Sequence, residues 1–264
     1  LDDFVGMTEV KEVIRRLAIQ VTFLQERAKM GIGSAEDMPS MNVVLTGNPG
    51  TGKTSVARKL GQVLQGMGVL LTSKVVEVDR SMLVGKYHGA TPKLVNSYIE
   101  QAMGGILFID EAYTLSQNGD QYGIEAIDTL MKRMEDDAGK FVVIAAGYQH
   151  EMEAFMMTNP GLSSRFNYRL HIDDYSASEL VEIFKRMAAK SEYTLTPDAE
   201  VKLFQTVMEM YQNRGTQFGN ARTIRNLFSR TVQCVSVRYS EMNPAMRSSE
   251  TFGTLLPEDI PSAD

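Results

Sequence analysis

A glycine-rich interruption of an apolar run constrains this chain more than any other feature. The segment "GNPGTGKT", from Gly47 to Thr54, fits the pattern G-x-x-x-x-G-K-[ST], with an apolar run before it and a helical pattern after it. Glycines let the backbone wrap with its N–H groups turned inward, and the helix N-terminus strengthens the resulting anion site. The strand–loop–helix order predicts a phosphate-binding loop, in preference to a plain glycine-rich turn.

The loop motif also predicts what its side chains do. Lys53 is expected to reach the β- and γ-phosphates of a nucleoside triphosphate, and the Thr54 hydroxyl is expected to ligate Mg²⁺. The residues that we expect to bind the cofactor here are Asn48, Pro49, Gly50, Thr51, Gly52, Lys53, Thr54 and Ser55.

Two acids follow a fully apolar run at residues 106–109. Asp110 and Glu111 should end a buried strand at the sheet edge that carries the phosphate loop, because ligands of open α/β folds bind at that edge. Asp110 would hold the water shell of Mg²⁺, and Glu111 would orient and deprotonate an attacking water. A solvated strand end is the alternative. The pair favours hydrolysis of ATP over phosphate transfer to a small molecule.

The first part of the chain alternates predicted strands with predicted helices. The strands are apolar without period-2 alternation, which indicates a five-stranded parallel sheet covered by helices on both faces and joined by right-handed crossovers. Thr8 is predicted to cap the first helix. We expect strands at 41–45, 74–78, 106–109, 141–146 and 168–172, and helices at 8–30, 53–65, 91–103 and 122–136.

The pattern changes near Asp173, after which only helical periodicity is found. Helices are predicted at 176–190, 197–213 and 220–241, and Ser176 with Glu179 forms a capping-box signature for the first. The stretch after residue 243 is irregular, with a short apolar pair at 255–256. We therefore predict an α/β nucleotide-binding core at 1–172 and a small all-helical domain at 173–264.

Composition excludes several classes of function. The formal net charge is −6 and no basic cluster is present, so no nucleic-acid partner is expected. Cys234 is the only cysteine; it allows no intrachain disulfide and is interpreted as a small apolar helix residue rather than a reactive thiol. His88, His150 and His171 lack metal-ligand spacing.

Targeting signals are also lacking in the sequence. No segment approaches 18 uninterrupted apolar residues and no cleavable leader is visible, so we expect a cytoplasmic protein without a membrane segment. The sequence begins at Leu1 rather than at methionine, which is typical of a fragment of a longer chain.

Seven motifs in order resemble the AAA+ ATPases of the CbxX/CfqX group. They are "GNPGTGKT", "VEVDRSMLVGKYHGAT", "GGILFIDEAYTL", "EAIDTLMKRMED", "VVIAAGY", "NPGLSSRF" and "FGNARTIRNLF", and the match runs from about Asp2 to Ile260. The resemblance implies a P-loop core followed by a helical lid. It also implies a homo-oligomeric ring, usually a hexamer, with ATP between neighbouring subunits.

The resemblance assigns further residues to the nucleotide site. "NPGLSSRF" is similar to the segment with the arginine finger, so Arg165 would reach the γ-phosphate of a neighbour's ATP; the alternative is a surface arginine paired with an acid. "GNAR" resembles the sensor-2 motif, which makes Arg222 the lid residue that contacts phosphate. Arg225 could exchange roles with Arg222; the alternative is that either arginine lies on a solvated helix face. Val5 and Gly6 would pack against adenine.

Two further segments receive roles from the same resemblance. The fourth strand ends in Gly147 and Tyr148, where AAA+ proteins usually carry a polar sensor-1 residue, so the resemblance assigns that position to Tyr148. Tyr87, His88 and Gly89 match the first pore loop, in which an aromatic side chain grips a peptide; the alternative is a tyrosine that packs back on the sheet. The polar loop at 116–125 would also line the pore.

Three functions fit these features in descending order. The first is a ring ATPase that remodels a protein client, of unknown identity, through a central pore. The second is an ATP-dependent scaffold or switch that threads nothing. The third, a motor that acts on DNA, is disfavoured by the acidic charge balance.

Overall fold

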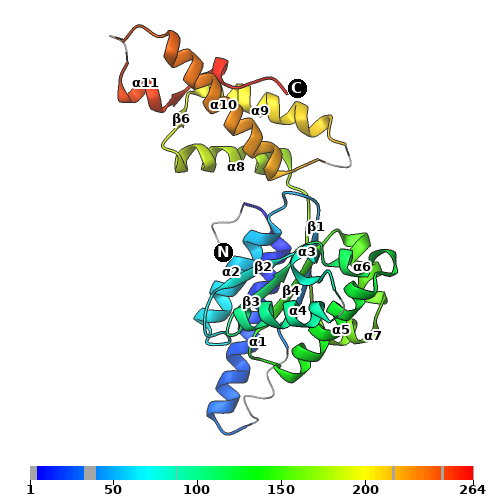
Figure 1. The fold of residues 1–264 in the computed structure, drawn as a ribbon. Helices are drawn as coiled ribbons and strands as arrows, with labels where there is room; N and C mark the ends of the chain where they lie inside the picture. Colours follow the sequence, from blue (N-terminus) through cyan, green and yellow to red (C-terminus); the bar gives the residue numbers. More distant parts are fainter. Residues whose placement is uncertain (1–4, 33–39, 88, 216–217, 245–246, 264) are drawn as a thin grey trace. The chain divides into compact units, whose positions relative to one another are not determined.

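The computed structural model describes residues 5–32, 40–87, 89–215, 218–244 and 247–263. Contacts divide the chain into two compact units (Figure 1). The first, the core, comprises Met7–Gly47 and Gly52–Ile172. The second, the lid, comprises Asp173–Asp264 together with the loop Asn48–Thr51 and a short segment that ends at Gly6. Because the loop groups with the lid, the predicted single division at 172/173 stays a prediction.

The core contains the expected five-stranded parallel sheet, in the order β2-β3-β4-β1-β5. Thr46 of β1 pairs with Gly147 of β4, and Ala145 of β4 pairs with Ile109 of β3. This register brings the carboxyl ends of β1, β3 and β4 to one edge of the sheet. The strands are β1 (Val43–Gly47), β2 (Val75–Val78), β3 (Ile106–Ile109), β4 (Val142–Gly147) and β5 (Tyr168–Ile172).

Helices cover both faces of this sheet, as predicted. Leu107 and Ile109 of β3 point into an apolar cluster formed with α4 and α5. Ile106 faces α2, where a Cβ on Gly61 would lie 3.2 Å from the Ile106 Cδ1 atom. The core helices are α1 (Thr8–Lys29), α2 (Lys53–Gly66), α3 (Arg80–Leu83), α4 (Ala90–Ala102), η2 (Ala112–Gly119), α5 (Gln121–Asp136), α6 (Gln149–Met157) and α7 (Pro160–Arg165).

The starts of α1 and β1 differ from prediction. Thr8 is not a cap: the residue before α1 is Met7, which has a left-handed φ of 54° and makes no side-chain capping bond. β1 begins at Val43 rather than at residue 41, because the buried Asn42 side chain is already engaged at the start of the strand. Its amide donates to the Arg165 carbonyl oxygen at 3.1 Å and accepts from the Val143 N–H at 2.7 Å.

In its described residues the lid contains four α-helices, and the first of them begins with the predicted capping box of Ser176 and Glu179. It also contains a pair of two-residue parallel strands, β6 (Thr194–Leu195) and β7 (Thr254–Leu255), which the all-helical prediction missed. Elements this short have no periodicity to detect. The other lid elements are α8 (Ala177–Lys190), α9 (Pro197–Gln212), α10 (Ala221–Glu241), α11 (Ser249–Gly253) and η4 (Pro257–Asp259).

The segment predicted to be irregular closes the lid. Leu255 and Ile260 are buried, and η4 packs on α9 and α10. Asp259, also buried, accepts hydrogen bonds from Arg238 Nε and Nη2, both at 2.9 Å. A buried carboxylate is stabilised only when it is paired in this way, so Arg238 and Asp259 fix η4 against α10. In the parts of the chain that the structure describes, no helix has the length and apolar character needed to span a bilayer.

Candidate functional site

The phosphate loop has a backbone that only glycine adopts easily. Gly50 and Gly52 have φ values of 71° and 98°, and Gly52 immediately precedes α2. A Cβ on Gly50 would also lie 2.0 Å from the Gly219 carbonyl oxygen, so a larger residue does not fit. The first N–H groups of α2 have no partner within the helix, and they carry the positive end of its dipole. The arrangement can bind an anion.

Lys53, the first residue of α2, spans the space between two strand ends. Its Nζ atom donates to the Gly47 carbonyl oxygen at 2.7 Å and lies 5.7 Å from the centre of the Tyr148 ring. Gly47 ends β1 and Tyr148 follows β4, so the ammonium group is held at the carboxyl edge of the sheet. Tyr148 is half-buried and its ring contacts that of Tyr113, with centroids 6.0 Å apart. The structure thus brings Lys53 and the sensor-1 candidate together.

The acid pair follows β3 at the same edge. Asp110 and Glu111 are exposed and directly follow Ile109, whose partner on β4 is Ala145, two residues before the Gly147 that pairs with Thr46. The Glu111 backbone is left-handed, with φ of 48° and ψ of 46°. This conformation is unfavourable for a residue with a side chain and is characteristic of functional sites. Thr114 holds it in place, because its N–H and hydroxyl donate to the Glu111 carbonyl oxygen at 2.9 and 2.7 Å.

The environment of Tyr113 shows that negative charge is present near the carboxyl edge of the sheet. Burial raises the pKa of Tyr113 to about 12, and nearby negative charge adds to the effect, with Glu111 contributing before Glu151 and Asp110. Carboxylates therefore lie near Tyr113, and an anionic ligand bound beside them would be repelled unless a cation accompanied it. Among the described residues, no group of three or more His, Cys, Asp or Glu side chains could hold a metal by themselves.

Arg165 lies at the end of α7 and is engaged within its own chain. Its Nε donates to the Met131 carbonyl oxygen at 3.1 Å, its Nη1 donates to the Gly161 carbonyl oxygen at 3.2 Å, and its Nη2 pairs with the Glu135 carboxylate. About a quarter of the side chain is exposed. In a single chain Arg165 is thus a paired arginine, and its reach to a neighbour's phosphate stays a prediction.

A second group of predicted residues lies together in the lid unit. Gly6 abuts α8, since a Cβ on it would lie 2.0 Å from Glu179 Oε1. The Arg222 backbone N lies 3.0 Å from the Cβ position of Gly50, while the side chains of Arg222 and Arg225 are exposed. Val5 is half-buried in the same unit. Thr54 and Ser55 belong instead to the first turn of α2 in the core.

Among the described residues, three lid side chains hydrogen-bond the phosphate loop and were not predicted from the sequence. Asp174 accepts from the Asn48 amide at 3.0 Å, the Tyr175 hydroxyl donates to the Thr51 carbonyl oxygen at 3.0 Å, and Asn220 donates to the Pro49 carbonyl oxygen at 3.3 Å. Asn220 stands inside the quoted "GNAR" motif. A Gly-Asn pair directly before a helix was the signal available in the sequence.

The pore-loop candidate belongs to the core unit. Tyr87 is 76% exposed, which rules out a tyrosine packed back on the sheet. Gly89 precedes α4 with a left-handed φ of 77°, and the Ala90 N–H donates to the Tyr87 carbonyl oxygen at 3.0 Å. His88 lies outside the described residues.

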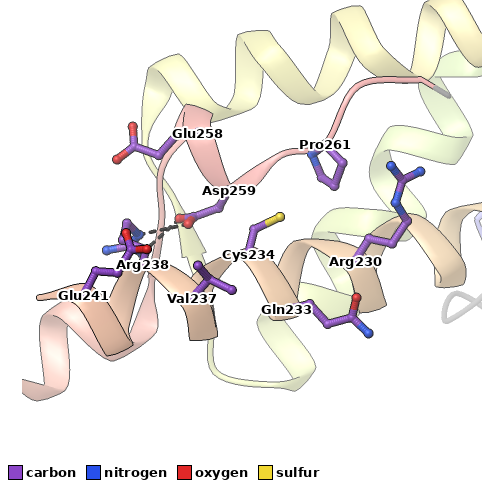
Figure 2. Close-up of a pocket in the computed structure, with 9 residues that line it drawn as sticks. All are labelled: Arg230, Gln233, Cys234, Val237, Arg238, Glu241, Glu258, Asp259 and Pro261. Atoms are coloured by element: carbon purple, nitrogen blue, oxygen red, sulfur yellow. Dashed lines mark hydrogen bonds and ion pairs between the residues drawn. The ribbon is translucent and has the colours of Figure 1, made fainter.

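A separate hollow of about 580 Å³ lies in the lid between α10 and the segment 258–261 (Figure 2). Cys234 projects into it from α10, and the Arg238–Asp259 ion pair forms part of its wall. None of the residues predicted for nucleotide binding lines it.

Comparison with known proteins decides the family. Residues 43–174 match the family described as ATPase family associated with various cellular activities (AAA), and residues 176–264 match the AAA lid domain. This chain belongs to the AAA family. Within it, the relatives are AAA+ ATPases of the CbxX/CfqX type, as the sequence motifs indicated. The AAA+ protein described here therefore binds ATP and is an ATP hydrolase.

Individual relatives cover most of the AAA+ chain. Stage V sporulation protein K of Bacillus subtilis is 40% identical over 236 residues, which are 89% of this chain and 73% of the relative. The chloroplastic ribulose bisphosphate carboxylase/oxygenase activase of Cyanidioschyzon merolae is 37% identical over 267 residues, which cover 98% of this chain and 86% of the relative. The RuvB branch migration motor of Thermotoga maritima superposes with a TM-score of 0.61 at 22% identity, over 90% of this chain and 66% of that one. At that identity the likeness shows the fold alone.

Proposed function

We propose that this ATPase assembles into a ring, with hexameric symmetry as in its family, and uses ATP hydrolysis to remodel a protein client through a central pore. The observation that carries the proposal is the exposed Tyr87, presented by a glycine-flanked loop of an ATP hydrolase. An aromatic ring exposed to this extent offers an apolar contact to any extended peptide. The relative named ribulose bisphosphate carboxylase/oxygenase activase acts, by its name, on a protein, which supports a protein client.

Within the proposed site, each residue acts by position and charge. The N–H groups of residues 50–55 and the Lys53 ammonium bind the β- and γ-phosphates, while Val5 and Gly6 contact adenine. Glu111 orients and deprotonates water, Tyr148 aligns it, and Arg222 contacts phosphate from the lid. Arg165 completes the site of the neighbouring subunit. In an assembled ring the Arg165 guanidinium would leave the Glu135 carboxylate and bind the phosphate of a neighbour's ATP, which would link hydrolysis to assembly.

Magnesium fits the donors at this edge. Thr54 offers a hydroxyl and Asp110 offers an exposed carboxylate, which are oxygen donors of the kind that Mg²⁺ takes alongside substrate phosphates. The carboxylates around Tyr113 also favour a phosphate ligand that arrives with a cation. When bound, the ion would neutralise charge on the β- and γ-phosphates. Thr54 and Asp110 would hold it, Asp110 through water.

Lys53→Ala is expected to weaken ATP binding by about 10- to 100-fold, because a charge-assisted hydrogen bond is worth roughly 1.5–3 kcal/mol. Equilibrium titration with a fluorescent ATP analogue measures the loss. Lys74→Ala is the matched control, since Lys74 is an exposed lysine before β2 and should leave affinity unchanged. Equal affinity of the Lys53→Ala variant and the parent would refute the phosphate role of Lys53.

Tyr87→Ala is expected to abolish stimulation of the ATPase by an unfolded polypeptide. With reduced casein as the probe, the ratio of stimulated to basal rate should fall to about one, whereas Tyr87→Phe keeps the ring and the ratio. Phe204→Ala removes a half-exposed aromatic side chain on α9 and serves as the control. If the parent is stimulated and Tyr87→Ala responds equally, the ATPase is an assembly scaffold or switch that does not thread its client.

A DNA-acting motor remains the less favoured function. The net charge of −6 gives no general attraction to phosphate backbones, and the RuvB likeness carries only the fold. Strong stimulation of hydrolysis by single- or double-stranded DNA would reverse this ranking. The cytoplasmic location also stays a prediction.

A further inference from the structure

We infer that Asn220 is a positioning residue for ATP binding, which, together with Tyr175, sets the orientation of the phosphate-loop peptides. The inference rests on the proposed phosphate role of the loop. Asn220, Tyr175 and the loop residues Asn48–Thr51 all belong to the lid unit. Neither Asn220 nor Tyr175 is expected to touch the nucleotide itself.

The Asn220 side chain is fully buried and connects three segments. Its Oδ1 atom accepts from the Tyr175 N–H at 3.1 Å, and its Nδ2 atom donates to Asp174 Oδ1 at 2.7 Å and to the Pro49 carbonyl oxygen at 3.3 Å. Asp174 in turn accepts from the Asn48 amide through both oxygens, at 3.0 and 3.1 Å. Asparagine suits this place because it presents a donor and an acceptor at once.

The backbone of Asn220 indicates that its side chain is needed here. It has φ of 47° and ψ of −126°, a conformation that glycine adopts far more easily. A turn alone would be made at less cost by glycine. The cost is offset by the hydrogen bonds of the amide, which explains why asparagine stands at a position suited to glycine.

Three consecutive carbonyl groups of the loop are held by lid residues. Pro49 O accepts from Asn220, Gly50 O accepts from the Ala221 N–H at 3.2 Å, and Thr51 O accepts from the Tyr175 hydroxyl at 3.0 Å. Burial raises the pKa of Tyr175 to about 12, with a further contribution from Glu179, so the hydroxyl stays protonated and donates at neutral pH.

The planar peptide converts these contacts into an orientation of donors. In a trans peptide the C=O and the next N–H point in opposite directions. Holding the carbonyls of residues 49–51 therefore turns the N–H groups of Gly50, Thr51 and Gly52 away from Asn220 and Tyr175. Thr51 N–H makes one long bond of 3.4 Å within the loop, to Asn48 O. Inward-facing N–H groups are what a phosphate loop presents to its anion.

Asn220→Gly tests the inference, because glycine keeps the backbone conformation and removes only the side chain. We expect the Kd for a fluorescent ATP analogue and the KM for ATP to rise by about 10-fold, with kcat within a factor of about 2. Tyr175→Phe, which removes one hydroxyl, should raise both by about 3- to 10-fold. Asn220→Ala adds backbone strain, so its melting temperature should be lower than that of Asn220→Gly at a similar Kd.

The control is Thr231→Val, which removes a fully buried hydroxyl of α10 whose hydrogen bond stays within the helix, to Leu227 O at 3.0 Å. Its Kd should equal that of the parent. If Asn220→Gly fails to fold, Tyr175→Phe decides the question. A parent that binds ATP while Tyr175→Phe and every folded Asn220 variant bind it equally well would overturn the inference and leave the proposed function intact. A parent without affinity for ATP would overturn the proposed function instead.

Discussion

Glu111→Gln is expected to bind ATP as tightly as the parent while its turnover falls by about 10²- to 10⁴-fold. A positioned general base contributes a rate factor of that size, and glutamine keeps the shape of glutamate but cannot accept a proton. The strained backbone of Glu111, fixed by Thr114, holds this residue just beyond the end of β3, next to Asp110. Steady-state phosphate release and a nucleotide titration measure the two quantities.

Glu153→Gln provides the matched control, since Glu153 is an exposed glutamate on α6. It should hydrolyse ATP at the parental rate. Because Glu111→Gln keeps its ATP, sedimentation velocity of this variant with saturating ATP should also reveal the assembled ring. If Glu111→Gln turned over within about threefold of the parent, Glu111 would not be the base.

Arg165→Ala is expected to lower kcat by about 10³- to 10⁵-fold, which is the range known for arginine fingers in phosphoryl transfer. The guanidinium neutralises charge that develops in the transition state, and no shorter or uncharged side chain replaces it. Affinity for ATP should change little. Arg58→Ala, which breaks a surface ion pair of the core with Glu77, should have no comparable effect.

A mixing experiment separates action between subunits from action within one. Lys53→Ala subunits bind ATP poorly but keep Arg165. Arg165→Ala subunits keep the phosphate site with Lys53 but lack the arginine. Mixed rings should regain part of the parental rate because a Lys53→Ala subunit presents its arginine to a neighbour's intact site. Purely additive rates would contradict an arginine finger in trans. Thermal melting of Arg165→Ala measures the separate loss of its bonds to Met131 and Gly161.

Most of the core could be predicted because its signals are local. β3 was predicted to the residue, since Ile106–Ile109 is apolar between a glycine pair and an acid pair. β1 was displaced by two residues because the burial and hydrogen bonds of Asn42 depend on Val143 and Arg165, far along the chain. β6 and β7 could not be predicted, because a two-residue strand exists only through its partner.

The residues of the candidate site could likewise be predicted only where their signal is local in the sequence. The phosphate loop and the acid pair follow from a motif, since the geometry of each is fixed by neighbouring residues. Asn220 was missed because its role depends on Pro49 and Asp174, which only tertiary folding brings to it. The pairing of Arg165 with Glu135 likewise depends on how α5 and α7 pack, and no spacing in the sequence encodes it.

The place of β7 sets an order of events during protein synthesis. A nascent chain that has emerged from the ribosome only through α10 lacks Leu255 and Ile260, which fill the interior beneath α9 and α10. The core sheet needs nothing beyond Ile172, so it can form earlier. On the positioning role inferred for Asn220, full ATP affinity therefore also requires that translation pass Asn220, later than the sheet itself.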